Sequence, residues 1–189
     1  MSARRILGGV RRPLAVLAVL CLAACASTRV VDRAADGTPI LIGGPQPDAD
    51  SLERLQRFHG PIKTVVNLRG EFPGEAWYDR EREAVEAIGA QWIQLPTSGY
   101  LEPPPETVHA FFDIVEDRAN WPVFLHCQMG IHRTGLMLAL YRMQYQGWTG
   151  ERAWAEMKGN GFKWTRVDRS AVEAYVRGYA PDSERTIQR

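Results

Sequence analysis

Short apolar runs alternate with segments of helical periodicity over the first two thirds of the chain. Four runs have the length and composition of buried strands: 39–44, 63–69, 90–96 and 122–127. Three segments between them repeat apolar residues at helical spacing: 48–60, 76–90 and 104–118. Strands and helices that alternate in this way pack best as an α/β sandwich. We therefore expect three layers, with a central, mainly parallel sheet of four to five strands flanked by helices.

Three further helices are predicted after the last strand: 133–147, 149–159 and 168–180. Asp168 at the start of the third is a residue type that caps helix N-termini. A chain of 189 residues with 45% hydrophobic residues can build one globular core. We expect a single domain over 38–180, followed by a disordered tail over 181–189.

The first 24 residues have the layout of a secretory signal. Four arginines and no acidic residue precede an apolar run at 14–24. This run is shorter than the ~20 residues that a membrane-spanning helix needs. Its end, LAAC at 22–25, resembles the lipobox of bacterial lipoproteins, in which cleavage precedes the cysteine and the thiol receives a lipid.

The lipobox resemblance implies that 1–24 is a lipoprotein signal peptide, that Cys25 is the lipidated first residue of the mature protein, and that 25–37 is a flexible tether. In lipoproteins, a residue such as Ala26 after the cysteine favours the outer over the inner membrane. We therefore expect a lipid-anchored protein on the periplasmic side of a bacterial cell envelope. An ordinary soluble signal peptide and an uncleaved inner-membrane anchor are the alternatives.

Removal of the signal changes the balance of charges and thiols. Loss of four arginines leaves 19 basic against 22 acidic residues, so no overall basicity predicts a nucleic acid partner. Cys127 is then the single thiol of the domain, in an oxidising compartment where paired cysteines are common. It is either a reactive group or an inert core residue of a structural envelope protein.

The surroundings of Cys127 favour the reactive alternative. Cys127 ends a predicted strand, and ligands bind outside the carboxyl ends of strands in open parallel sheets. The loop 128–132 exposes backbone N–H groups at a helix N-terminus, where the helix dipole favours anions and thiolates. Arg133 can bind two oxygens of a phosphate, and Thr134 can donate a hydrogen bond to the sulfur. The pattern predicts a thiolate nucleophile in a phosphate cradle.

The sequence HCQMGIHRTG at 126–135 is similar to the HCx5RTG motif of cysteine-based tyrosine and dual-specificity phosphatases. The similarity extends over about residues 38–162 to bacterial members and to the plant and fungal atypical group, in which a histidine such as His132 also precedes the arginine. The resemblance implies a protein tyrosine phosphatase-like fold and hydrolysis through a cysteinyl phosphate, without cofactor or metal. It also implies a phosphate-binding loop made of Gln128, Met129, Gly130, Ile131, His132 and Arg133. His126 would orient this loop and tune the thiolate rather than carry a proton.

The general acid that protonates the leaving group is the weakest part of the match. Family members place an aspartate on a loop upstream of the cysteine, whereas the corresponding segment 95–106 contains no Asp. Glu102 is the candidate there, and a solvated loop charge is the alternative. Glu71 is a second candidate, while Asp113 lies in the middle of a predicted helix, too far away to serve.

The loop composition gives two interpretations of the substrate. The neutral side chains of Gln128, Met129 and Ile131 favour a substrate of low charge, such as a phosphotyrosine protein or a small phosphate ester. His132 and the similarity to the atypical group favour inositol or condensed phosphates. We expect a phosphoprotein, and a catalytically silent phosphate-binding module is the alternative from another functional class.

Two basic features near the motif have no single interpretation. Arg69 either contacts substrate or is a surface charge. A basic stretch interleaved with aromatic residues forms either a rim contact for an acidic or aromatic substrate or a solvated face. Its basic members are Lys158, Lys163, Arg166 and Arg169, and its aromatic members are Phe162 and Trp164.

Overall fold

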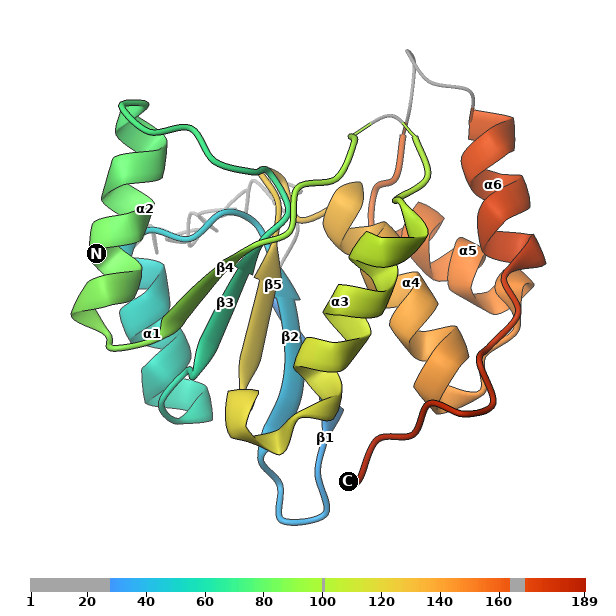
Figure 1. Cartoon of the computed structure of the whole chain (residues 1–189), viewed down its shortest axis with the longest axis horizontal. Helices are drawn as coiled ribbons and strands as arrows, with labels where there is room; N and C mark the ends of the chain where they lie inside the picture. Colours follow the sequence, from blue (N-terminus) through green and yellow to red (C-terminus); the bar gives the residue numbers. More distant parts are fainter. Residues whose placement is uncertain (1–27, 100, 164–168) are drawn as a thin grey trace, which may run out of the picture.

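The computed structural model describes residues 28–99, 101–163 and 169–189 of the chain. Their strands form one five-stranded sheet with the order β1-β2-β5-β3-β4 (Figure 1). The strands are β1 (Arg29–Arg33), β2 (Pro39–Gly44), β3 (Thr64–Asn67), β4 (Gln91–Gln94) and β5 (Val123–His126). All neighbouring pairs are parallel except β1 and β2 at the edge. This arrangement confirms the predicted α/β fold with a mainly parallel sheet.

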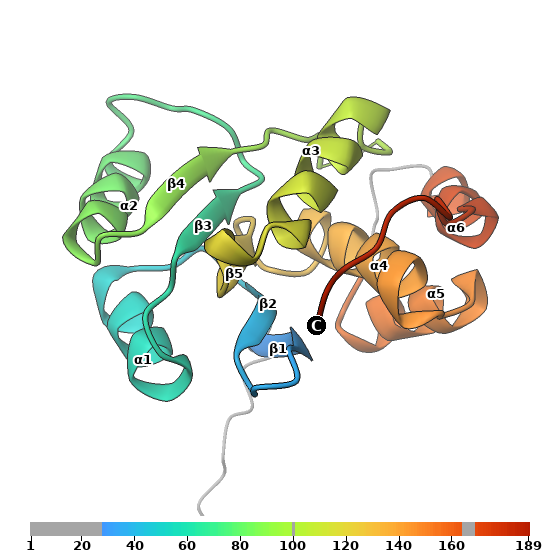
Figure 2. The same ribbon diagram turned by 60° about the horizontal axis from the view of Figure 1, so that its bottom comes forward.

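Helices cover both faces of the sheet (Figure 2). One face carries α1 (Ala49–His59) and α2 (Ala76–Ala87). The other face carries α3 (Pro105–Glu116) and α4 (Arg133–Gln146). Outside α4 lie α5 (Gly150–Gly159) and α6 (Arg169–Gly178), and a short 3₁₀ turn (Arg118–Asn120) precedes β5. The three predicted layers are therefore present, with a fourth, partial layer built by the last two helices.

The continuous apolar runs of the central strands follow from this double coverage. Successive side chains of a strand point to opposite faces, and a sheet covered on both faces needs apolar residues at every position. On β5, Phe124 packs among the residues of α1 and α2, whereas Val123 and Leu125 belong to the larger core beneath α3 and α4. The strand that leads to the loop 128–132 is thus anchored in two separate cores.

The structure corrects the prediction of a flexible tether over 25–37, because 29–33 forms β1. Tyr141 on α4 donates a hydrogen bond of 2.8 Å to Asp32, and Gln146 donates one of 3.1 Å to the Val31 carbonyl. Tyr141 and Gln146 lie more than a hundred residues further along the chain. The five residues 29–33 are themselves partly polar, so their local pattern does not predict a strand. The folded domain therefore begins near Arg29.

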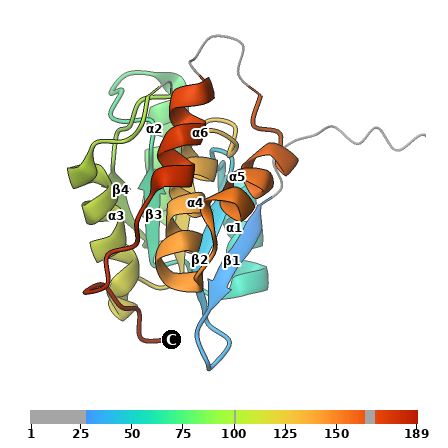
Figure 3. The ribbon, with the colours of Figure 1, turned by 90° about the vertical axis from the view of Figure 1, so that its right-hand side faces the viewer.

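The structure also corrects the predicted disorder of the tail 181–189. Figure 3 shows the C-terminal segment running back beside α3 and α4. Arg185 contacts Asp113 at 2.8 Å and Glu116 at 3.1 Å, both on α3, and Ile187 packs against the core. The tail is polar in composition, and its order comes from these distant partners.

The predicted signal peptide 1–24, Cys25, Tyr100 and 164–168 lie outside the described residues. Within the part of the chain that is described, no helix is both long and apolar enough to span a membrane.

Candidate active site

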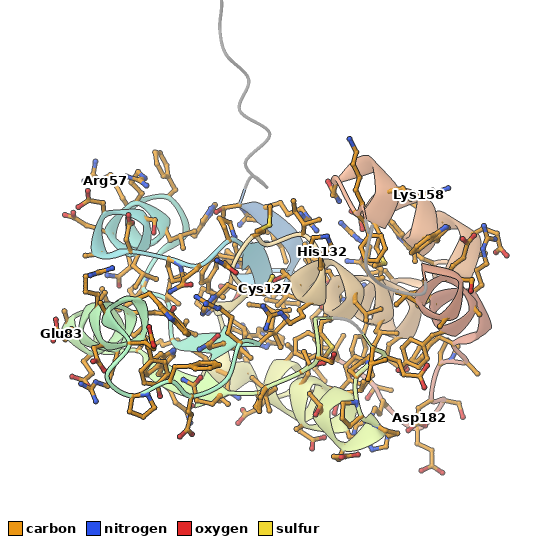
Figure 4. The ribbon with its side chains drawn as sticks, turned by 90° about the horizontal axis from the view of Figure 1, so that it is seen from above. Arg57, Glu83, Cys127, His132, Lys158 and Asp182 are labelled. Atoms are coloured by element: carbon orange, nitrogen blue, oxygen red, sulfur yellow. The ribbon has the colours of Figure 1, made fainter. Side chains whose placement is uncertain are left out.

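The loop 128–132, which the sequence predicts to be catalytic and which is called the catalytic loop below, begins at the carboxyl end of the central strand. β5 lies between β2 and β3, and Cys127 follows its last residue, His126. Residues 128–132 then connect to α4, which starts at Arg133. Figure 4 looks down on this edge of the sheet, with Cys127 near the middle of the molecule and His132 beside it. The structure therefore places the predicted nucleophile where open parallel sheets bind ligands.

The environment of Cys127 favours the thiolate. The side chain is only 2% exposed, and burial alone raises the pKa of the thiol. The Thr134 hydroxyl, the backbone N–H groups of Thr134 and Gly130, and the charge of Arg133 outweigh burial, so the pKa lies below its ordinary value. Thr134 Oγ1 is itself buried and makes no hydrogen bond with another described group, which leaves its proton for the sulfur.

The loop is held in place by backbone contacts from neighbouring segments. Gly130 has φ +68°, a left-handed conformation, and a Cβ there would lie 2.5 Å from the carbonyl carbon of Gly44. The Gln46 N–H donates to the Gln128 carbonyl at 3.2 Å. Arg133 Nη1 donates to the Leu68 carbonyl at 3.3 Å, which ties the guanidinium to the segment after β3. The loop is thus held by contacts within the chain itself.

His126 is completely buried beneath the loop and contacts a residue that the sequence analysis missed. Its Nδ1 lies 3.3 Å from the Cys127 carbonyl oxygen, and its Nε2 lies 2.9 Å from Oε1 of Glu81 on α2. The second contact is close, but its geometry is not that of a hydrogen bond. Glu81 occupies the same apolar stripe of α2 as Tyr78 and Val85. A carboxylate on a core-facing stripe was the signal that could have revealed it.

Arg69 lies next to the catalytic loop rather than on the open surface. Its guanidinium carbon is 3.4 Å from the centre of the Trp77 ring, and its side chain hydrogen-bonds Gln46. Burial lowers the pKa of Arg69, and the nearby charge of Arg133 lowers it further. Arg69, Trp77 and Gln128 line a pocket of about 790 Å³ that opens beside the loop. This pocket gives the phosphate site a neighbour large enough for part of a substrate.

The structure does not bring the general-acid candidates into contact with Cys127. Glu102 is exposed, and its charge acts on Tyr175 of α6, whose pKa is raised by burial and then by Glu102. Glu71 is exposed as well, and its charge acts on Tyr78. Asp113 pairs with Arg185 on the outside of α3. The assignment of Glu102 as general acid stays a prediction.

The basic stretch after α5 is only partly beside the site. His132 Nε2 lies 3.4 Å from the Lys163 carbonyl oxygen, and the His132 ring packs edge-on against Phe162 at 5.5 Å. Burial lowers the pKa of His132. Lys158 stands on α5, apart from Cys127 (Figure 4). The Arg169 side chain, Trp164 and Arg166 lie outside what the structure describes.

Comparisons with known proteins agree with this geometry. The family model described as DSP-PTPase phosphatase fused to NAD+ kinase matches residues 26–175. The dual specificity protein phosphatase TpbA of Pseudomonas aeruginosa strain UCBPP-PA14 is 32% identical over 148 residues. That match covers 78% of this chain and 63% of TpbA, less than two thirds of its length. The inositol diphosphatase DSP3 of Arabidopsis thaliana is 28% identical over 106 residues, which cover 53% of this chain and 52% of DSP3.

Two solved structures illustrate the likeness in three dimensions. The crystal structure of P. aeruginosa TpbA in complex with pTyr has 30% sequence identity and a TM-score of 0.57, covering 73% of this chain and 78% of that chain. The core catalytic domain of the PP-IP phosphatase SIW14 from S. cerevisiae has 22% identity and a TM-score of 0.62, covering 78% of this chain and 84% of that chain. At that identity the SIW14 match shows a common fold alone.

Proposed function

Because this chain belongs to the dual-specificity phosphatase family described as DSP-PTPase phosphatase fused to NAD+ kinase, we propose that it is a cysteine-dependent phosphatase. The observation that carries the proposal is Cys127, a buried thiol with a lowered pKa at the focus of the loop 128–132 and Arg133. A cysteine that only fills space in the core does not need N–H donors and an arginine directed at its sulfur.

The proposed reaction has two steps at phosphorus. In the first, the Cys127 thiolate forms a sulfur–phosphorus bond while the bond to the leaving oxygen breaks, and that oxygen takes up a proton. Arg133 and the loop N–H groups bind the equatorial oxygens, where charge develops in the transition state. In the second, water attacks phosphorus and the sulfur departs as thiolate, which Thr134 stabilises. Inorganic phosphate is released and the thiolate is restored.

A phosphotyrosine protein is the substrate class that the surface favours. Three of the large exposed apolar side chains lie on the loops that follow β3, β4 and β5, at the same edge as Cys127: Phe72 (46% exposed), Leu101 (68%) and Met129 (54%). A phosphoprotein can cover such residues, whereas a phosphorylated sugar cannot. TpbA, the relative above, has been crystallised with pTyr.

The charges of the neighbouring pocket point the same way. Its walls include Asp48, Asp50 and Glu83 as well as Arg69 and Arg80, so acidic residues outnumber basic ones. Carboxylates around the entrance repel a polyanion such as an inositol diphosphate. An inositol or condensed phosphate is nevertheless the second candidate. Arg69 and His132 add hydrogen-bond donors beside the phosphate cradle, and the relative DSP3 is named an inositol diphosphatase.

The first experiment measures phosphate release from p-nitrophenyl phosphate by the full chain under reductant, with and without a chelator. We expect turnover that survives the chelator and is abolished by Cys127→Ser, with phosphate binding retained. Equal turnover by Cys127→Ser would refute the mechanism. Phosphate binding without turnover on any substrate would instead identify a silent binding module.

The substrate class is tested with the same protein. We expect Leu101→Ser to lower kcat/KM for a phosphotyrosine protein several-fold while leaving p-nitrophenyl phosphate hydrolysis unchanged. Phe58→Ser is the matched control, because Phe58 is 74% exposed near the end of α1, at the opposite edge of the sheet. A higher kcat/KM for an inositol diphosphate than for any phosphotyrosine protein would overturn the assignment.

We also propose that the mature protein is anchored to a bacterial membrane through lipid on Cys25, on the periplasmic side. The support is the LAAC sequence at 22–25 after an arginine-rich, apolar leader. Mass spectrometry of the membrane fraction should find a lipidated peptide starting at Cys25. Cys25→Ala should release or mislocalise the protein, and an unmodified Cys25 would contradict the anchor.

A further inference from the structure

The pocket beside the catalytic loop extends away from the reacting groups, and the proposed reaction does not use its outer part. The pocket has a volume of about 790 Å³ and is lined by the start of α1, by α2 and by the loops after β2, β3 and β5. Gln128 of the catalytic loop belongs to its wall, so the pocket is continuous with the phosphate cradle. Glu83, which also lines it, stands on α2, apart from Cys127 (Figure 4). A substrate bound at Cys127 can therefore extend into this space.

The charges of the pocket are divided between its walls. Arg69 stands next to the catalytic loop, where burial and then the charge of Arg133 lower its pKa, and its guanidinium carbon lies 3.4 Å from the centre of the Trp77 ring. On the walls formed by α1, the residue before it and α2, carboxylates are in excess: Asp48, Asp50 and Glu83 against Arg80. The pocket is thus positive where it meets the phosphate cradle and acidic along the two helices.

Two of these carboxylates have no partner within the chain. Asp48 caps α1 by accepting from the Ser51 N–H at 2.8 Å, which accounts for an acid at that position. Asp50 and Glu83 are exposed, and the ion pairs on α1 and α2 do not include either of them among the described residues. Glu83 also lies outside the first turn of α2, where the helix dipole would favour a carboxylate. Their negative charge is therefore available to a ligand.

The inner wall of the pocket adds a buried acceptor and an apolar surface. Glu81 lines the pocket and is 1% exposed, and its Oε2 has no hydrogen-bond partner among the described residues. A buried oxygen without a donor is unfavourable, and an N–H group supplied by a ligand removes that cost. Pro47 and Ala84 are buried apolar residues of the same walls. The pocket therefore offers apolar contacts together with acceptors for a cation.

We propose that this pocket binds a lysine or arginine side chain of the substrate protein, carried by a residue close in sequence to the phosphorylated one. Both side chains combine an aliphatic stem with a cationic head. The stem packs against Pro47 and Ala84, and the head pairs with Asp50 and Glu83. The inference rests on the proposed function and deepens it, because it requires a phosphate and a cation on neighbouring residues of the substrate. Asp50 and Glu83 are then specificity-determining residues.

The test compares phosphotyrosine peptides that differ at a single position. A parent peptide with alanine around the phosphotyrosine is compared with peptides that carry one lysine, norleucine or glutamate at each of four positions on either side. We expect one or two lysine positions to raise kcat/KM about fivefold over the parent. The gain should shrink in 0.5 M salt, because the carboxylates are exposed. No gain at any lysine position, or an equal gain with the uncharged norleucine, would overturn the proposal.

Charge reversal in the pocket locates the preference on the protein. We expect Glu83→Lys to reduce the gain from lysine to less than twofold and to improve the glutamate peptides. The matched control is Glu86→Lys, because Glu86 is an exposed carboxylate of the same helix that does not line the pocket. Both variants change the net charge equally, so a difference between them reports the position of the charge. An unchanged lysine preference in Glu83→Lys, or an equal loss in Glu86→Lys, would contradict the pocket assignment.

A binding measurement separates this inference from the proposed phosphatase activity. If the full chain hydrolyses none of the peptides, the same set is compared by the dissociation constants of fluorescently labelled peptides. A lysine peptide that binds about fivefold more tightly than the parent, and loses this advantage with Glu83→Lys, would support the pocket although the phosphatase mechanism had failed. Equal affinities of the lysine and alanine peptides would overturn the pocket assignment as well.

Discussion

The substitution Gly130→Ala tests whether the shape of the catalytic loop depends on one backbone conformation. Gly130 has φ +68°, which costs a residue with a Cβ about 1–2 kcal/mol. The added Cβ would also lie 2.5 Å from backbone atoms of Gly44 and Pro45, about 1 Å inside van der Waals contact. Neither partner is a flexible side chain, so the loop or the segment after β2 must move by about that distance.

A displacement of this size has two measurable effects. We expect the free energy of unfolding to fall by about 1–3 kcal/mol, from the strain and the clash together. We expect kcat/KM to fall about 100-fold, because the loop N–H groups no longer converge on the phosphate. Urea unfolding and p-nitrophenyl phosphate kinetics measure the two effects on the same preparation.

The matched control is Gly159→Ala at the end of α5. Gly159 has no positive φ, and a Cβ there meets nothing within 4 Å. We expect its stability to change by less than about 1 kcal/mol, with kcat/KM unaffected. The reasoning fails if Gly130→Ala keeps kcat/KM within twofold, or if Gly159→Ala loses as much activity as Gly130→Ala.

Two further predictions concern the thiol and the tail. Burial raises the pKa of Cys127, and the Thr134 side chain lowers it more than any other neighbour. Thr134→Ala should therefore shift the alkylation of Cys127 to higher pH and slow the release of the thiolate in the second step. An unshifted alkylation curve would contradict this. Removing residues 181–189 should lower the unfolding temperature, because Arg185 and Ile187 lose their partners on α3 and in the core, while kcat/KM stays the same. An unchanged unfolding temperature would show that these contacts contribute nothing measurable.

The features that could be predicted from the sequence depend on neighbouring residues. The strand before Cys127 is an apolar run that ends in His126, and the helix that starts at Arg133 is strongly apolar, so the sequence pattern reveals both. The interval between the cysteine and the arginine is likewise a short-range property of the chain. The fold class and the position of the loop therefore followed from local pattern.

The features that could not be predicted depend on partners distant in the chain. β1 is held by β2 and by α4 residues such as Tyr141, and the tail is held by α3. Glu81 contacts His126 across 44 intervening positions, and the helical pattern of α2 gives no sign of that partner. The general acid is predicted by resemblance, and among the described residues neither Glu102 nor Glu71 has a contact that supports the role.

The direction of β1 has a consequence for where the proposed activity would take place. β1 is antiparallel to β2, and Arg29 pairs with Gly43, so the chain enters the sheet at the edge that also carries Cys127. If Cys25 bears the proposed lipid, the four residue steps from Cys25 to Arg29 span at most about 14 Å. The entrance of the active site would then be tethered close to the lipid headgroups. Only phosphate groups near the bilayer surface would be cleaved. Distance from the membrane would then select among substrates independently of the side chains of the pocket.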